Sequence, residues 1–342
     1  MKKVLEASQV SVNIADYYDN EKKLYKPYPV FPFLSETDIR KGIVELIDED
    51  VLATEIKTLH YLSRNSNNTI EDTEMIICLV KWHEYPELMK MLTIIREWAF
   101  RNDGGGVGSN DCDEFDLRPE MEQLIILNPN YEETIGSIIG GYRYIVHNTD
   151  TYEHGPMGAH YQYSDEWKSQ QWIELGRSFI NPYFQTQAKR HSIDYVIHGL
   201  GYIYARYPKS EGYFGKVTLY NIYEKTAADK FFLATAKTFF TPTNDIWVNP
   251  EERMEEGSLT VAQRERLQKG IFKGLFYLLR NDYHLNIPRI MAVYNRMTRI
   301  ENIMYFGAFR HFSFGNTTEV GIAIRSKDLY DVIREKFVKD YI

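Results

Sequence analysis

The segment WIELGRSFINPYFQ, residues 172–185, restricts the fold more than any other stretch of this sequence. Its alternating aromatic and aliphatic residues indicate a β-strand, and an Asn-Pro pair ends that strand before a helical pattern begins. In a regular strand Glu174 and Arg177 would point to opposite faces, because they are three residues apart. Gly176 lies between them and is a typical position for a β-bulge. We therefore predict a bulged central strand that brings this carboxylate, this guanidinium and unpaired backbone N–H groups into one cleft.

The length and composition indicate a globular protein with a sizeable core. The chain has 342 residues, of which 44% are hydrophobic and 26% are charged. Its formal net charge of -8 argues against a nucleic-acid partner, because phosphate binding requires a basic field. The sequence has two cysteines and no apolar run as long as a membrane span. We therefore expect a cytoplasmic protein whose contact with the inner membrane, if any, is peripheral.

Hydrophobic periodicity predicts an α/β, or α+β layered, fold with helices flanking a mixed, mostly antiparallel sheet. Residues 1–83 are expected to form an N-terminal arm and helical extension. Residues 84–342 are expected to form the main domain, with a charged helical insertion at about 250–285 and an irregular connection at 148–170. The helices are predicted near residues 35–47, 50–62, 86–100, 186–206, 225–240, 288–304 and from 326, and the strands near residues 75–82, 122–128, 138–147, 172–180, 212–223, 306–314 and 319–325.

Charged and aromatic residues recur in a fixed order along the chain. They are, in sequence, Arg96, Phe100, Asp113, Asp116, Arg143, Glu174 and Arg177. This ordered series, with the GGG loop between Phe100 and Asp113 and the FGAFRHFSFG segment near the C-terminus, resembles N-acyltransferases of the GNAT superfamily that use acyl carrier protein. The amino-acid lipid synthases often labelled hemolysins are the most similar branch, and acyl-homoserine-lactone synthases are more distant. The similar region runs from about residue 35 to the C-terminus.

The resemblance implies a GNAT-like fold and an enzyme of amino-acid lipid biosynthesis. Such an enzyme transfers a 3-hydroxy fatty acyl group from acyl carrier protein to the α-amino group of a small amino acid. The members that align best favour glycine as the acceptor, and ornithine is the alternative. A candidate function of a different class is a noncatalytic module that binds a lipid or a protein on the same fold.

The turn after the central strand bears on the identity of the acyl donor. Acetyl-CoA users in the superfamily carry a glycine-rich turn there, whose N–H groups hold the pyrophosphate at a helix N-terminus. In this chain the same place reads PYFQTQAKRHS and contains no glycine. This difference favours the phosphopantetheine thioester of acyl carrier protein over CoA, and we expect no tightly bound cofactor. The residues expected along the pantetheine and acyl chain are Gly176, Ser178, Phe179, Ile180, Gln185, Lys189 and Arg190.

Glu174 is the predicted catalytic base, with Arg177 beside it. The acceptor amine must lose a proton before it attacks, and burial would raise the pKa of a carboxyl toward the range in which it accepts that proton. Backbone N–H groups freed between Gly176 and Phe179 would bind the oxyanion. The alternative interpretation is a buried ion pair between Glu174 and Arg177 with no catalytic role.

The remaining residues of the series are predicted to bind the acceptor. Arg96, Asp113, Asp116 and Arg143 would form a charged network that orders the loop, and Arg143 or Arg177 would bind the acceptor carboxylate with two parallel hydrogen bonds. Phe100 would line the substrate channel. The alternative is a purely structural ion-pair cluster.

Two other patterns are discounted. His160 and Asp165 fit the H-x4-D motif of glycerolipid acyltransferases, but nine histidines in an acidic chain produce about one such match by chance. Asp113 and Asp116 lack a histidine or further oxygen ligand nearby in sequence, so no metal site is expected.

Overall fold

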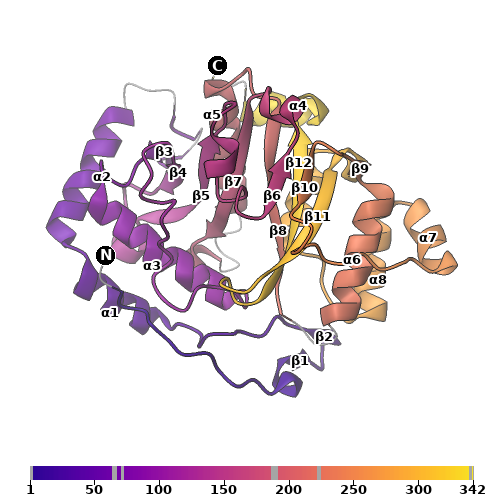
Figure 1. Ribbon diagram of the computed structural model, residues 1–342. Coiled ribbons are helices and arrows are strands. Elements are labelled where there is room, and N and C mark those ends of the chain that lie inside the picture. Colours follow the sequence, from indigo (N-terminus) through magenta and orange to yellow (C-terminus); the bar gives the residue numbers. More distant parts are fainter. Residues whose placement is uncertain are drawn as a thin grey trace.

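The computed structural model describes residues 3–63, 68–70, 73–185, 192–221, 225–338 and 341. Within this part of the chain an eight-stranded sheet forms the centre of the molecule (Figure 1). Neighbouring strands are antiparallel except for the parallel pairs β7–β8 and β9–β11, so the predicted mixed, mostly antiparallel sheet is confirmed. In spatial order the strands are β3 (Ile76–Val80), β4 (Glu122–Leu127), β5 (Ile138–Val146), β7 (Trp172–Ile180), β8 (Gly212–Leu219), β12 (Thr317–Arg325), β11 (Met304–His311) and β9 (Thr241–Pro242).

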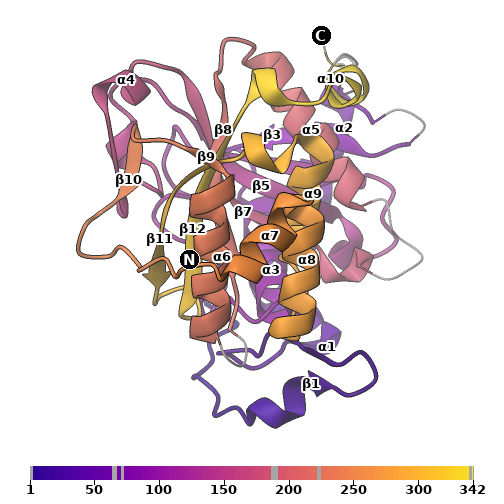
Figure 2. The ribbon, with the colours of Figure 1, turned by 90° about the vertical axis from the view of Figure 1, so that its right-hand side faces the viewer.

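Helices cover both faces of this sheet (Figures 1 and 2). Consecutive strand residues point to opposite faces, so Ile76 and Ile77 of β3 join different apolar clusters. The first cluster packs against α1 (Glu36–Leu46), α2 (Glu49–Ser63) and α3 (Pro86–Asn102). The second packs against α5 (Ser192–Arg206), α6 (Lys225–Phe239), α8 (Ile271–Asp282), α9 (Arg289–Met297) and α10 (Asp331–Phe337), while α7 (Val261–Gln268) packs on α8.

The helix starts follow from local sequence. Ser35 accepts a hydrogen bond from the backbone of Asp38, and the Asp38 carboxylate accepts one from the backbone of Ser35, so the predicted start of α1 is a complete capping box. Pro86 occupies the first turn of α3, where a missing N–H costs nothing. The predicted helices and strands of the main sheet are present, with bounds shifted by a few residues.

The connection at 148–170 was expected to be irregular, and this expectation is wrong. It contains β6 (Tyr161–Tyr163) and α4 (Asp165–Lys168). β6 pairs antiparallel with β10 (Ile246–Val248) in a separate two-stranded sheet. Its two tyrosines are buried in a third apolar cluster with Trp167, Trp172 and Phe214, which covers the α3 side of the main sheet over β8 and β12. A three-residue strand gives too short an alternation to predict from sequence.

The predicted bulge in β7 is confirmed. Gly141 of β5 pairs with Phe179 and Arg143 pairs with Gly176, so β7 holds one extra residue between these two pairs. Arg177 in this stretch has a φ of 53°, an uncommon conformation for a non-glycine residue that suits a bulge. On the other edge of β7, parallel pairing with β8 ends at Leu175 and Gly215. Beyond that point the two strands separate.

The N-terminal arm lies along one end of the sheet in both views (Figures 1 and 2). It contains the short hairpin of β1 (Tyr18–Asp19) and β2 (Leu24–Tyr25). Its backbone is bonded to the body, with Ala7 N–H donating to Gly108 and Tyr28 N–H donating to Asn221. The division of the chain at residue 83 stays a prediction, and β3, which precedes that point, is an edge strand of the main sheet. No helix in the described residues is long and apolar enough to cross a bilayer.

Candidate active site

A large cavity opens where β7 and β8 separate. Its volume is about 1790 Å³, and its lining includes Gly176 and Ser178 of β7 and Gly215 and Lys216 of β8. Pockets for a single small ligand are usually about 300 to 1,000 Å³. The space is therefore sufficient for two substrates at once.

The cavity reaches both faces of the sheet. On the α5–α9 face its lining is hydrophobic; we call this part the apolar chamber, and it includes Val196, Leu200, Ala228, Phe232, Leu279, Val293, Met297 and Ile322. On the α3 face its lining is charged; we call this part the polar chamber, and it includes Asp111, Asp113, Arg143, His160, Glu174, Arg177, Lys216, His311 and Glu319. Since one continuous cavity contains both sets, it passes through the sheet between the diverging strands.

Glu174 is at the wall of the polar chamber and is held in place by two hydrogen bonds. Its Oε1 accepts from the backbone N–H of Met157 at 2.9 Å, and its Oε2 lies 3.0 Å from His147 Nε2. The other ring nitrogen of His147 is 3.1 Å from Thr151 Oγ1. Glu174 is 2% exposed and still lines the cavity, so it reaches the opening that a catalytic base requires.

A glycine makes room for this arrangement. A Cβ atom on Gly155 would lie 2.4 Å from Glu174 Oε2 and 2.8 Å from the His147 ring, too close for any side chain. The backbone that precedes Met157 can therefore pass directly over the carboxylate. His147 was not expected at the site, because it is the pairing of β5 with β7 that brings it to Glu174.

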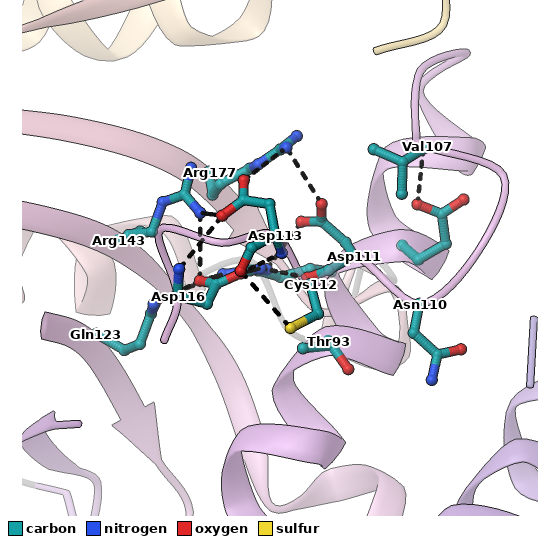
Figure 3. A network of polar contacts seen from close by, with 12 residues as sticks. Thr93, Val107, Asn110, Asp111, Cys112, Asp113, Asp116, Gln123, Arg143 and Arg177 are labelled. Carbon is teal, nitrogen blue, oxygen red and sulfur yellow. Dashed lines mark hydrogen bonds and ion pairs between the residues drawn. The ribbon is translucent and has the colours of Figure 1, made fainter. Parts of the chain in front are cut away.

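Three arginines and three aspartates form a network at the wall of the polar chamber (Figure 3). Arg96 pairs with Asp111 at 2.9 Å and with Asp116 at 2.8 Å. Arg143 pairs with Asp113 at 2.5 Å and with Asp116 at 3.3 Å. Arg177 pairs with Asp111 at 3.4 Å and with Asp113 at 3.3 Å. The charges of these six residues balance.

Charge pairing sets the protonation state of the network. Burial alone would raise the pKa of Asp116, but Arg96 and Arg143 outweigh it and hold that pKa well below its ordinary value. Burial opposes the charge on Arg96 too, and the aspartates overcome this effect and raise its pKa. Asp116 and Arg96 are therefore ionised at neutral pH.

The glycine-rich loop before these aspartates is folded around a second buried ion pair. Glu97 pairs with Arg101 at 2.6 Å and accepts hydrogen bonds from the backbone N–H groups of Val107 and Gly108. Gly106 has a φ of +98°, and a Cβ on it would lie 2.9 Å from the Glu97 carboxylate. The loop therefore needs glycine for both its backbone conformation and its close approach to α3. This clamp positions Asp111 and Asp113 at the cavity.

Known proteins show which family shares this arrangement. Residues 95–193, from α3 to the start of α5, match a family model described as an acetyltransferase (GNAT) domain. A glycine N(alpha)-acyltransferase of Phocaeicola vulgatus is 26% identical over 326 residues, which cover 88% of this chain and 93% of the relative. A second protein of that name, from Bacteroides thetaiotaomicron, is 28% identical over 319 residues, covering 88% and 90%. This chain is an acyltransferase that is similar to GNAT N-acyltransferases.

Among solved structures, FeeM, an N-acyl amino acid synthase from uncultured soil microbes, aligns with this chain. The sequence identity is 8% and the TM-score is 0.33, over 74% of this chain and 92% of that chain.

The matched GNAT segment contains every residue of the ordered series, and the structure divides that series into two groups. Phe100, Asp113, Arg143, Glu174 and Arg177 line the cavity. Arg96 and Asp116 are fully buried behind it, where they hold the others in place. Asp111 was not among the expected residues, although it lies in the same acidic run and both pairs in the network and lines the cavity.

The residues that were expected to contact the acyl donor lie where the strands diverge. Gly176, Ser178, Phe179, Ile180 and Gln185 of the acyltransferase line the cavity. Lys189 and Arg190 lie outside the described residues. The H-x4-D pattern does not form a catalytic pair in this enzyme, because His160 is hydrogen-bonded to Glu252 at 2.9 Å and Asp165 pairs with Lys168 in α4.

Proposed function

We propose that this enzyme transfers a 3-hydroxy fatty acyl group from the phosphopantetheine of acyl carrier protein to the α-amino group of glycine. The observation that carries the proposal is the single cavity that joins an apolar chamber to a polar chamber beside Glu174. An acyl chain suits the first chamber and a zwitterionic amino acid suits the second. The names of the two curated relatives support glycine as the acceptor.

The reaction needs one proton acceptor and no covalent enzyme intermediate. The glycine ammonium gives a proton to Glu174, and the neutral amine attacks the thioester carbonyl. The C–N bond forms, the tetrahedral oxyanion collapses, and the C–S bond breaks. The second nitrogen proton goes to the departing thiolate, so the products are an amide, a thiol and the proton held by Glu174.

His147 is a positioning residue in this scheme. It is stacked on Tyr152 with ring centroids 4.4 Å apart, and its contacts with Glu174 and Thr151 fix the ring at both nitrogens. A base held by two neighbours stays aimed at the acceptor while substrates exchange. His147 itself does not line the cavity.

The separated strand edges provide the site for the thioester. β7 continues to Ile180 and β8 to Leu219, while their mutual pairing ends at Leu175 and Gly215. Backbone N–H groups on the unpaired edges are available to the pantetheine amides and to the oxyanion. The absence of glycine from the turn PYFQTQAKRHS supports acyl carrier protein over CoA, because a pyrophosphate needs the close backbone approach that glycine allows.

The test combines purified enzyme, 3-hydroxyacyl carrier protein and a panel of amino acids, with products identified by mass. We expect N-acylglycine. Formation of N-acylornithine in place of N-acylglycine would identify ornithine as the acceptor. Tight lipid binding with no product from any amino acid would contradict the proposal and support a noncatalytic module.

Glu174→Gln tests the assigned base. Glutamine keeps an oxygen for the Met157 N–H but cannot accept the proton, so we expect turnover to fall by about 100-fold or more with nearly unchanged thermal stability. Glu211→Gln is the matched control, because Glu211 is ion-paired with Arg325 and does not line the cavity. Retained turnover in Glu174→Gln would exclude the carboxylate as the base.

A further inference from the structure

Lys216 of β8 lies in the polar chamber and has no direct ion pair in the described structure. Its side chain lines the cavity, and among the described residues its Nζ makes no ion pair and no hydrogen bond. Its nearest ring contact is Phe309, whose centroid lies 5.3 Å from the Nζ. An ammonium group enclosed by protein without an anion is costly unless a ligand supplies one.

The other cations that face the polar chamber are already neutralised. Arg143 and Arg177 share Asp111, Asp113 and Asp116 with Arg96, so the described part of the network has no surplus positive charge. Burial, with the charges of Lys216 and Arg177, lowers the pKa of His311 to about 2. Since His311 stays neutral, it offers no charge to an anion.

The register of the sheet places Lys216 at a suitable position relative to Glu174. Glu174 pairs with Phe214 across the parallel β7–β8 ladder, and Lys216 is two residues further along β8. The two side chains therefore leave the same face of the sheet from diagonal positions, and both line the cavity. In an α-amino acid the carboxylate and the amine are separated by one carbon. A small amino acid can therefore contact both side chains at once.

We propose that Lys216 binds the α-carboxylate of the acceptor and thereby aims its amino group at Glu174 and at the thioester. This inference rests on the proposed function and assigns the anchoring role to Lys216 in place of the two arginines. In this assignment the arginine network stabilises the wall of the polar chamber, Lys216 binds the carboxylate, and Glu174 accepts the proton.

Neighbouring charges agree with this assignment. Burial lowers the pKa of Lys216; Glu319 and Glu174 oppose that shift, while Arg177 and Arg143 add to it. Glu319 is bound by the hydroxyls of Thr218 and Thr317, which keep its carboxylate in place on β12. A substrate carboxylate would bring the opposite charge that the ammonium group lacks, and would stabilise its protonated form.

The experiment compares glycine with glycinamide, which has the same amine and no carboxylate. Steady-state acyl transfer from 3-hydroxyacyl carrier protein is measured for the wild type, Lys216→Met, Lys216→Gln and Lys216→Arg. We expect the wild type to prefer glycine. In Lys216→Met and Lys216→Gln, kcat/KM for glycine should fall about 10- to 100-fold, mainly through KM, because a charge-assisted contact is lost. The kcat/KM for glycinamide should change little in these two variants, so their preference for glycine over glycinamide should disappear. Lys216→Arg should keep part of that preference.

The possible outcomes distinguish failure of the role assigned to Lys216 from failure of the proposed function. An equal loss of kcat for glycine and glycinamide would overturn the anchor and assign Lys216 to proton transfer or the oxyanion. An unchanged preference in folded Lys216→Met and Lys216→Gln would overturn it as well. A wild type that acylates no amino acid would instead reject the proposed function. Lys230→Met, on an exposed helix surface, is the control for loss of a lysine, and thermal unfolding verifies that every variant is folded.

Discussion

At the scale of single residues, Arg96 shows how a charge far from solvent contributes to the site. It has no exposed surface, and it is bound to two aspartates and to the backbone carbonyl of Asp111. Replacing a well-packed buried ion pair as a whole is often neutral, whereas removing one partner leaves an uncompensated charge. The network is therefore most sensitive to the loss of a single member.

This reasoning predicts the effect of Arg96→Met. The substitution leaves Asp111 and Asp116 with one cation fewer, and we expect the free energy of unfolding to fall by roughly 3 to 5 kcal/mol. Arg40→Met is the comparison. Arg40 pairs with Glu36 and Glu133 at the solvent-exposed surface, so its loss should change the free energy of unfolding little. Urea denaturation followed by circular dichroism measures both. Equal effects of the two substitutions would show that burial of the network has no energetic role.

The same network predicts how stability depends on acid. The pKa values of Asp113 and Asp116 are lower in the folded protein than the ordinary value of 3.8, so their stabilising contribution is complete above that pH. It is lost as the pH falls below 3.8 toward the folded-state pKa values. We expect the melting temperature to drop steeply in this range, and Asp116→Asn to show a shallower drop from a lower starting value. Melting curves at successive pH values test this, and parallel curves for the two proteins would contradict it.

Sequence reasoning found residues that lie near one another along the chain or in a familiar order. The series from Arg96 to Arg177 was found in this way. His147, Asp111 and Lys216 were not found. The fold brings Glu174 to His147 and Arg177 to Asp111 from distant parts of the sequence, and Lys216 has no direct ion pair in the described structure. Such relations exist only after β5, β7 and β8 are aligned.

At the scale of elements, a glycine in the bulge of β7 and a glycine in the loop after α3 have opposite requirements. A Cβ on Gly176 would meet nothing within 4 Å, so that residue opens onto the cavity. Gly106 in the loop after α3 has a positive φ, and a Cβ on it would lie too close to the Glu97 carboxylate. Gly106 is therefore needed for its backbone conformation, and Gly176 is needed for the free volume beside it.

Gly176→Val and Gly106→Ala should therefore fail in different ways. The valine fills space near the thioester, and we expect KM for the acyl donor to rise several-fold with the melting temperature within a few degrees of wild type. The alanine is strained and displaces the Glu97 clamp, and we expect about 1 to 3 kcal/mol of destabilisation. Donor kinetics and thermal unfolding of both variants make the comparison. Loss of stability in Gly176→Val without any change in KM would show that this glycine serves the strand and not the cavity.

Long elements were predictable and short ones were not. The bulge was predicted because a carboxylate and a guanidinium three residues apart in an apolar strand needed one, and glycine marked the place. β6 and β10 have three residues each, and their pairing joins segments more than eighty residues apart, so neither left a usable pattern. Tertiary packing of their aromatic residues determines them.

At the scale of the whole molecule, the apolar chamber should set the length of the acyl chain. Ala228 of α6 is buried and lines this chamber. Ala228→Phe would shorten the space, so we expect preference to shift toward shorter acyl groups while the rate with a short donor is retained. Acyl carrier proteins that carry acyl groups of increasing length are used to measure this shift. Ala227→Phe, on the exposed side of the same helix, is the control, and an unchanged chain-length profile in Ala228→Phe would place the acyl chain elsewhere.

The passage between β7 and β8 also determines how a finished molecule could depart. An N-acyl amino acid formed there would have its headgroup on one side of an eight-stranded sheet and its tail on the other. A product that leaves along its own length would draw its whole tail through the gap between β7 and β8. Each added methylene would lengthen that exit, and the longest amphiphiles would be the slowest to leave.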